Sequence, residues 1–209
     1  MSNNSLAVEL PNVKIFSISN WESKHVPYYP NDEWDEGHDY FTTIASAIKV
    51  PNVQEIRVEL AFEGDSFDIE WWLQLAFPRL WRSRSVTSLT FAIKQQRGNR
   101  NAVVFGEFFE YFPSLRSLAL DTRDYAGGVK LGELRRPSSA ENLESLQMKL
   151  WNIAEGRMQI YEMLREIVVE LGAPLRKVDI RSPYTLDIEA LEHIVPRADI
   201  YTATLDSRA

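Results

Sequence analysis

Side chains that could act as acids, bases or nucleophiles are few in this chain and lie far apart. Histidine is the residue type best suited to proton transfer near neutral pH, and the three present are His25, His38 and His193. None stands beside a serine at the end of an expected strand, and no Gly-x-Ser-x-Gly or phosphate-loop motif occurs. The chain has no cysteine, which excludes thiolate nucleophiles, disulfides and cysteine-bound zinc. The sequence therefore predicts no catalytic residue and no cofactor.

Three aspartates keep one enzymatic alternative open. Asp121, Asp124 and Asp179 lie near the carboxyl ends of expected strands, where α/β proteins gather their ligands. The alternative is a small α/β enzyme with its site at these strand ends. A deep pocket at Asp121, Asp124 and Arg181 would favour it, and a shallow open surface would count against it.

Residues 20–37 form the most unusual stretch, an expected irregular loop rich in acidic and aromatic side chains. The aromatic residues are Trp21, Tyr28, Tyr29 and Trp34. A calcium loop beginning at Asp32 fails the EF-hand spacing because its third position is Trp34, so no metal site is predicted. Aromatic side chains on loops often anchor protein interfaces. They suit equally well a cap packed under the loop, so both interpretations stay open.

Composition and net charge limit the classes of partner that this chain is expected to bind. Of 209 residues, 44% are hydrophobic and 25% charged, as in soluble globular domains. The net charge of -7 argues against nucleic acid as the main partner, although residues 71–106 carry basic side chains and no acid. The first ten residues do not resemble a signal peptide, and no stretch approaches the ~18 apolar residues of a membrane span. We expect a soluble intracellular protein, cytoplasmic or nuclear, without a membrane partner.

A short pattern of apolar residues recurs seven times: apolar, two residues, apolar, one residue, apolar. The copies begin at Val13, Val53, Val86, Leu115, Leu143, Leu175 and Ile200. Turn-forming Pro or Asn precedes most copies, and a turn followed by alternating apolar residues is typical of a strand. The pattern predicts strands near 13–19, 53–60, 86–94, 115–121, 143–149, 175–181 and 200–206.

Between these strands, apolar residues recur at the spacing of a helix with one buried face. The expected helices cover 38–50, 68–77, 102–112, 155–171 and 187–195. Alternating strands and helices predict a parallel strand arrangement with right-handed crossovers. A repeat of about 30 residues predicts stacked units. We therefore expect one domain over residues 1–209, a right-handed α/β solenoid with about seven parallel strands on the concave face and helices on the convex face.

The segments FPSLRSLAL at 112–120, ENLESL at 141–146 and PLRKVDI at 174–180 resemble the degenerate leucine-rich repeats of fungal F-box-type proteins. The resemblance implies a protein-binding horseshoe, the substrate-recognition part of a ubiquitin-ligase adaptor. The F-box would precede the repeats, and the twelve residues before Val13 are too few to hold it. A fragment of a longer adaptor and a free-standing binder both remain open.

Alternate residues of a strand point to opposite faces, which predicts the binding surface. Charged residues on the concave face are expected to orient a protein partner, because mixed charge sets register and specificity. They are Arg57, Glu59, Lys149, Asp179 and Arg181. The alternative is a solvated face whose charges neutralise one another. Self-association through an uncovered end of the solenoid is also expected.

Overall fold

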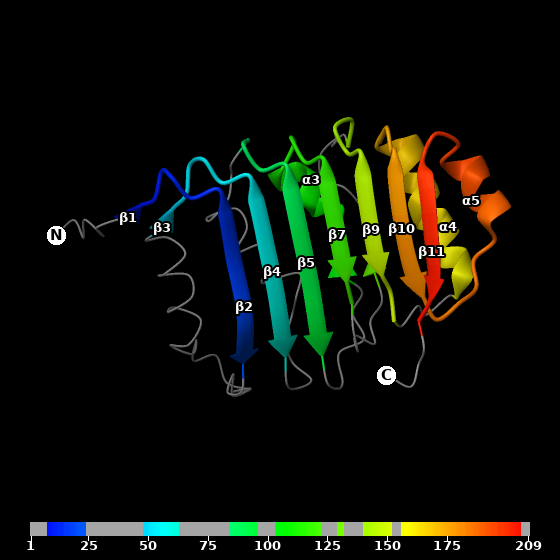
Figure 1. The fold of residues 1–209 in the computed structure, drawn as a ribbon, viewed down its shortest axis with the longest axis horizontal. Coiled ribbons are helices and arrows are strands. Elements are labelled where there is room, and N and C mark those ends of the chain that lie inside the picture. Colours follow the sequence, from blue (N-terminus) through cyan, green and yellow to red (C-terminus); the bar gives the residue numbers. More distant parts are fainter. Residues whose placement is uncertain are drawn as a thin grey trace, which may run out of the picture.

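The computed structural model describes residues 8–23, 48–62, 84–95, 103–122, 129–131, 140–151 and 156–205. A seven-stranded, all-parallel sheet runs through it, and its strands lie side by side in chain order (Figure 1). They are β2 (Ile15–Ser23), β4 (Glu55–Phe62), β5 (Ser88–Gln95), β7 (Ser117–Asp121), β9 (Ser145–Lys149), β10 (Lys177–Ser182) and β11 (Asp199–Thr204). The α/β class and the parallel arrangement are confirmed.

The strands stay in register across the sheet, which aligns the repeated apolar positions. Pairing places Ile56, Leu89, Leu118, Leu146 and Val178 in one row, and each is at most 1% exposed. A slip of one residue would turn a whole strand's apolar set toward solvent, so burial holds this register. The first six predicted strands are confirmed, with observed starts two residues later than expected.

The seventh predicted strand, 200–206, was wrong in register. Strand β11 pairs Lys177 with Asp199 and Val178 with Ile200, so Ile200 matches the second apolar position of the repeat. The first apolar position of this repeat is occupied by Arg197. Because arginine is not apolar, the sequence pattern was matched three residues too far along the chain. Tyr201 therefore lies on the face opposite the helices.

Backbone hydrogen bonds repeat at the turn before each strand. The carbonyl of Lys14 accepts from the N–H groups of Gln54 and Glu55 at 2.8 and 3.0 Å, and the same pairing recurs down the sheet. Side chains of the turns add to it: the Asn52 Nδ2 donates to the Pro11 carbonyl at 2.9 Å, and the Asn142 Nδ2 to the Pro113 carbonyl at 3.1 Å. These turn-forming residues thus also join one repeat to the next.

All the described helices lie on one face of the sheet (Figure 1). They are α3 (Glu107–Tyr111), α4 (Arg157–Arg165), its π-helical continuation Glu166–Glu170, and α5 (Ile188–Ile194). The buried rings of Phe91 on β5 and Phe108 on α3 meet with centroids 5.4 Å apart, which ties the helix layer to the sheet. The predicted end of the 155–171 helix is confirmed, because Gly172 has a φ of 68° that favours glycine.

Short strands replace parts of two predicted helices. Strand β3 (Ile48–Lys49) pairs with β1 (Val8–Glu9), and β6 (Val103–Val104) pairs with β8 (Val129–Lys130). The helices predicted to run to residue 50 and from residue 102 were wrong at these positions. β-Branched residues favour the extended backbone, and at residue 50 the following proline disfavours helix as well. The helix predicted at 68–77 lies outside the described residues.

No helix in the described part of the chain is long and apolar enough to cross a membrane.

Candidate binding face

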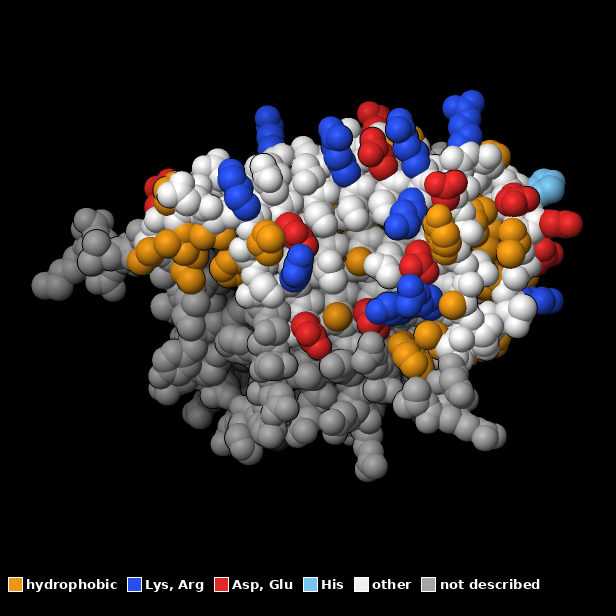
Figure 2. Space-filling view, viewed as in Figure 1, with side chains coloured by type: hydrophobic (Ala, Val, Ile, Leu, Met, Phe, Trp, Pro, Cys, Tyr) orange, Lys and Arg blue, Asp and Glu red, His pale blue; other side chains and the backbone are white. Residues whose placement is uncertain are grey.

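The sheet face opposite the helices, here called the open face, carries the strand residues that alternate with the core. Small uncharged side chains line its middle, on β5, β7 and the start of β9: Ser88, Thr90, Ala92, Ser117, Ala119 and Ser145. Asp121 ends this face of β7, and Gln147 and Lys149 follow Ser145 on β9. Charged side chains flank this middle on both sides (Figure 2). None of the described elements lies across it. Arg57, Glu59, Lys149, Asp179 and Arg181, predicted from alternation, have strand positions on this face.

The flank on β4 is built around one ion pair. The Arg57 Nε donates to Glu55 Oε1 at 2.6 Å, and the Arg57 side chain is 54% exposed. This hydrogen bond and the carboxylate charge raise the pKa of Arg57. Glu59 stands two residues further along the strand and is half-buried. Arg57 is therefore held along the strand with much of its surface open to a partner.

The opposite flank, on β9 and β10, holds a more connected set of charges. Asp179 accepts from Arg181 Nη2 at 3.2 Å and from Gln147 Nε2 at 3.3 Å, so it links two strands. The hydrogen bond and charge of Asp179 raise the pKa of Arg181. Beside them, the Lys149 Nζ lies 3.7 Å from Asp121 Oδ2. The flank is fixed in place and still exposes 43% of the Arg181 side chain.

The two flanks lie on one face but are not adjacent. From β4 to β10 there are four steps between neighbouring strands. At about 4.8 Å a step, they are roughly 19 Å apart. A ligand that touches both must span the sheet, as a protein segment can. Within each flank the opposite charges pair with one another, so the flank has little net charge. Its charged groups are therefore expected to orient a partner more than to add affinity.

Two large exposed side chains lie at the edges of the open face, and neither was among the residues predicted to bind a partner. Tyr201 on β11 is 55% exposed, and the Lys177 Nζ lies 5.8 Å from its ring centroid. Ile15 on β2, at the other edge, is 52% exposed. Tyrosine is among the residue types enriched at energetically important interface positions. Matching β11 to the repeat with Ile200 at the second apolar position would have placed Tyr201 on the open face.

The aromatic residues predicted to bind from a loop are only partly within the described structure. Trp21 belongs to strand β2, where its backbone pairs opposite Leu60 after a register shift. The loop predicted to begin at residue 20 was therefore wrong at its start, because the alternating strand pattern continues to Ser23. Tyr28, Tyr29 and Trp34 lie outside the described residues.

Of the three candidate catalytic aspartates, Asp121 and Asp179 lie on the open face, Asp121 beside Lys149 and Asp179 beside Arg181. Asp124 lies outside the described residues, and His193 on α5 places its Nδ1 2.8 Å from the Glu189 carbonyl oxygen. Among the described residues, no group of three or more His, Asp or Glu side chains could hold a metal ion. No protein-family model, curated protein or solved structure matches the chain. What it does is therefore inferred from its own residues.

Proposed function

We propose that this protein is a protein-interaction module of the leucine-rich-repeat type, which binds its partner on the open face. The support for a right-handed solenoid is the chain order of seven parallel strands, since each connection must return on the same side of the sheet. Hydrogen bonds repeated at equivalent turns support stacked units as well.

The observation that carries the proposal is the layout of the open face. Its middle is lined by small side chains such as Ala119 and Ser117, which let a partner segment approach the sheet closely. Arg57 and Arg181 stand on either side, each held by a carboxylate of its own strand. Because these groups are already ordered, binding loses little side-chain entropy. The arrangement suits an extended protein segment laid across the strands.

A more specific form of the proposal follows from the resemblance to F-box-type repeats. In this form the open face recognises the substrate of a ubiquitin ligase, and the ligase scaffold binds elsewhere on the full adaptor. The two forms differ in what accompanies the captured partner. A ligase scaffold subunit recovered together with it supports the adaptor, and its absence supports a free-standing binder.

Affinity capture from native cell extract, read by mass spectrometry, tests the proposal. The test variant carries Arg57→Ala, Asp179→Ala and Arg181→Ala. The control variant removes the same set of charges from the residues just before three strands, through Lys14→Ala, Arg116→Ala and Glu144→Ala. We expect wild type and control to retain a partner that the test variant loses. Equal retention by all three, or no partner retained by wild type, would contradict the proposal.

A further inference from the structure

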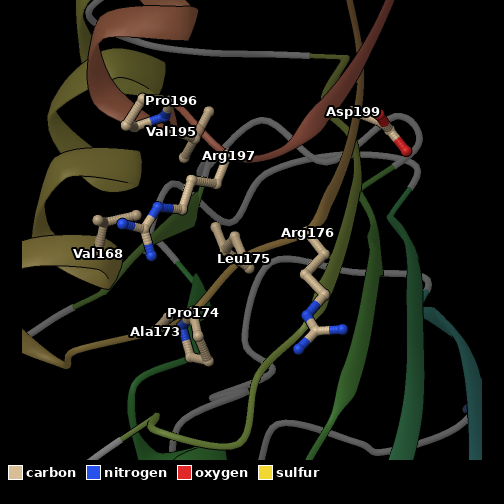
Figure 3. A pocket seen from close by; sticks show the side chains of 9 residues that line it. All are labelled: Val168, Ala173, Pro174, Leu175, Arg176, Val195, Pro196, Arg197 and Asp199. Carbon is tan, nitrogen blue, oxygen red and sulfur yellow. The ribbon is translucent and has the colours of Figure 1, made fainter.

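A pocket of about 530 Å³ opens at the edge where β10 and β11 begin, on the helix side of the sheet (Figure 3). Its apolar wall comes from Val168 after α4, from Leu175 before β10, and from Val195 after α5. Leu175 and Val195 are at most 5% exposed. Ala173, Pro174 and Pro196 also line it, and its charged side chains are those of Arg176, Arg197 and Asp199. The pocket thus combines a buried apolar floor with a charged rim.

The pocket exists because the last repeat departs from the other repeats at one core position. Arg197 stands two residues before β11, as Leu175 stands two residues before β10. In five of the six preceding repeats the equivalent residue is aliphatic and at most 5% exposed: Val53, Val86, Leu115, Leu143 and Leu175. In the first repeat it is Val13, which is half-buried. Arg197 is exposed, and its side chain extends past Leu175 toward Val168 (Figure 3). The place that an aliphatic side chain fills elsewhere is therefore left open.

Two arginines and one aspartate give this rim a net positive charge. Neither Arg176 nor Arg197 forms an ion pair or a side-chain hydrogen bond with a described residue. The one acid of the lining, Asp199, directs its carboxylate away from Arg197 (Figure 3). Guanidinium groups bind carboxylates through paired hydrogen bonds. The rim therefore favours an anionic group and the floor an apolar one.

We propose that this pocket binds a small organic anion with an apolar body, such as a medium-chain carboxylate. The volume lies within the range of small-molecule sites, about 300–1,000 Å³. The Arg197 guanidinium group holds the carboxylate, and the apolar body occupies the space beside Val168 and Leu175. The Arg176 guanidinium group points away from that of Arg197 and adds positive charge at the rim (Figure 3). The apolar wall of the site lies on the helix side of the sheet, away from the middle of the open face, so the site does not depend on the function proposed for that face.

Isothermal titration with decanoate tests the charge and the apolar requirement together. Decanol and decylammonium serve as neutral and cationic ligands with the same chain. We expect saturable one-site binding of decanoate, at least about tenfold tighter than that of either comparison ligand, since a carboxylate–arginine pair contributes about that much. No saturable binding up to millimolar decanoate, or equal binding of the three ligands, would overturn the proposal.

Two variants locate the site. Arg176→Ala with Arg197→Ala is expected to weaken decanoate at least about tenfold. The control, Lys14→Ala with Arg116→Ala, removes two charges at the turns of other repeats and should leave binding unchanged. Arg197→Leu restores the aliphatic side chain of the other repeats, so we expect a higher melting temperature and loss of decanoate binding. A folded Arg197→Leu variant that binds decanoate like wild type would place the ligand elsewhere and refute the pocket.

Discussion

The alternation between core and open face can be tested at two aliphatic residues, Leu118 and Ile15. Leu118 lies on the central strand β7, between Leu89 and Leu146 of the neighbouring strands, and is fully buried. Ile15 points to the open face and is 52% exposed. Truncating a buried leucine costs about 3–4 kcal/mol, through the lost burial and the cavity that remains. Truncating Ile15 should cost about 0.5 kcal/mol, as is typical of surface positions.

Urea unfolding followed by circular dichroism measures both changes. A total stability of about 5–15 kcal/mol leaves Leu118→Ala folded or marginally folded, with a much lower midpoint. In thermal unfolding the same loss corresponds to roughly 6–16 °C for a chain of this size. Ile15→Ala should stay close to wild type. Similar losses for the two variants, or a loss below about 1 kcal/mol for Leu118→Ala, would refute the assigned faces and register.

Three further changes probe the helix layer, each read as a melting temperature. Burial raises the pKa of Glu166, and the charges of Glu170 and Glu162 raise it further. The protonated carboxyl therefore favours the folded state: this contribution to the free energy of unfolding is complete below the unfolded-state pKa and is lost as pH rises through the folded-state pKa. Because Glu166 is only half-buried, Glu166→Gln should stabilise by about 0.5 kcal/mol at pH 7 and not at pH 3; destabilisation at pH 7 would contradict this. Asp187 caps α5 by accepting from the N–H groups of Glu189 and Ala190, so Asp187→Ala should cost about 1 kcal/mol, and an unchanged melting temperature would count against the cap. Gly172 has a φ of 68°, so Gly172→Ala should cost about 1 kcal/mol, whereas a gain would show that the turn relaxes.

The strands were predictable because alternation and burial act on the same residues. Ile56, Leu89 and Leu118 each sit at a fixed place in the pattern, and each is buried in the aligned row. The last strand failed because a single residue, Arg197, departs from that pattern at the end of the core. The helices were less predictable, since paired short strands at 48–49 and 103–104 take residues that helical spacing also allows.

The open face was predictable in its membership and not in its geometry. Alternation alone assigns Arg57 and Arg181 to one face, because the period of a strand is two residues. It gives neither their separation nor their partners, which depend on sheet order and on side-chain contacts such as that between Asp179 and Gln147. The pocket beside Arg197 could not be predicted from the sequence either, because its shape depends on which side chains surround the position where the other repeats have an aliphatic residue.

The central claim is that a protein partner lies across the middle of the open face. Ala119 on β7 is at that middle, between Thr90 and Gln147 of the neighbouring strands. Ala119→Arg adds a long charged side chain there and leaves the core unchanged. We predict that titrating the captured partner into this variant gives a Kd at least about tenfold weaker than for wild type, with an unchanged melting temperature. An unchanged Kd would contradict the claim, because a partner lying across the strands cannot avoid that side chain.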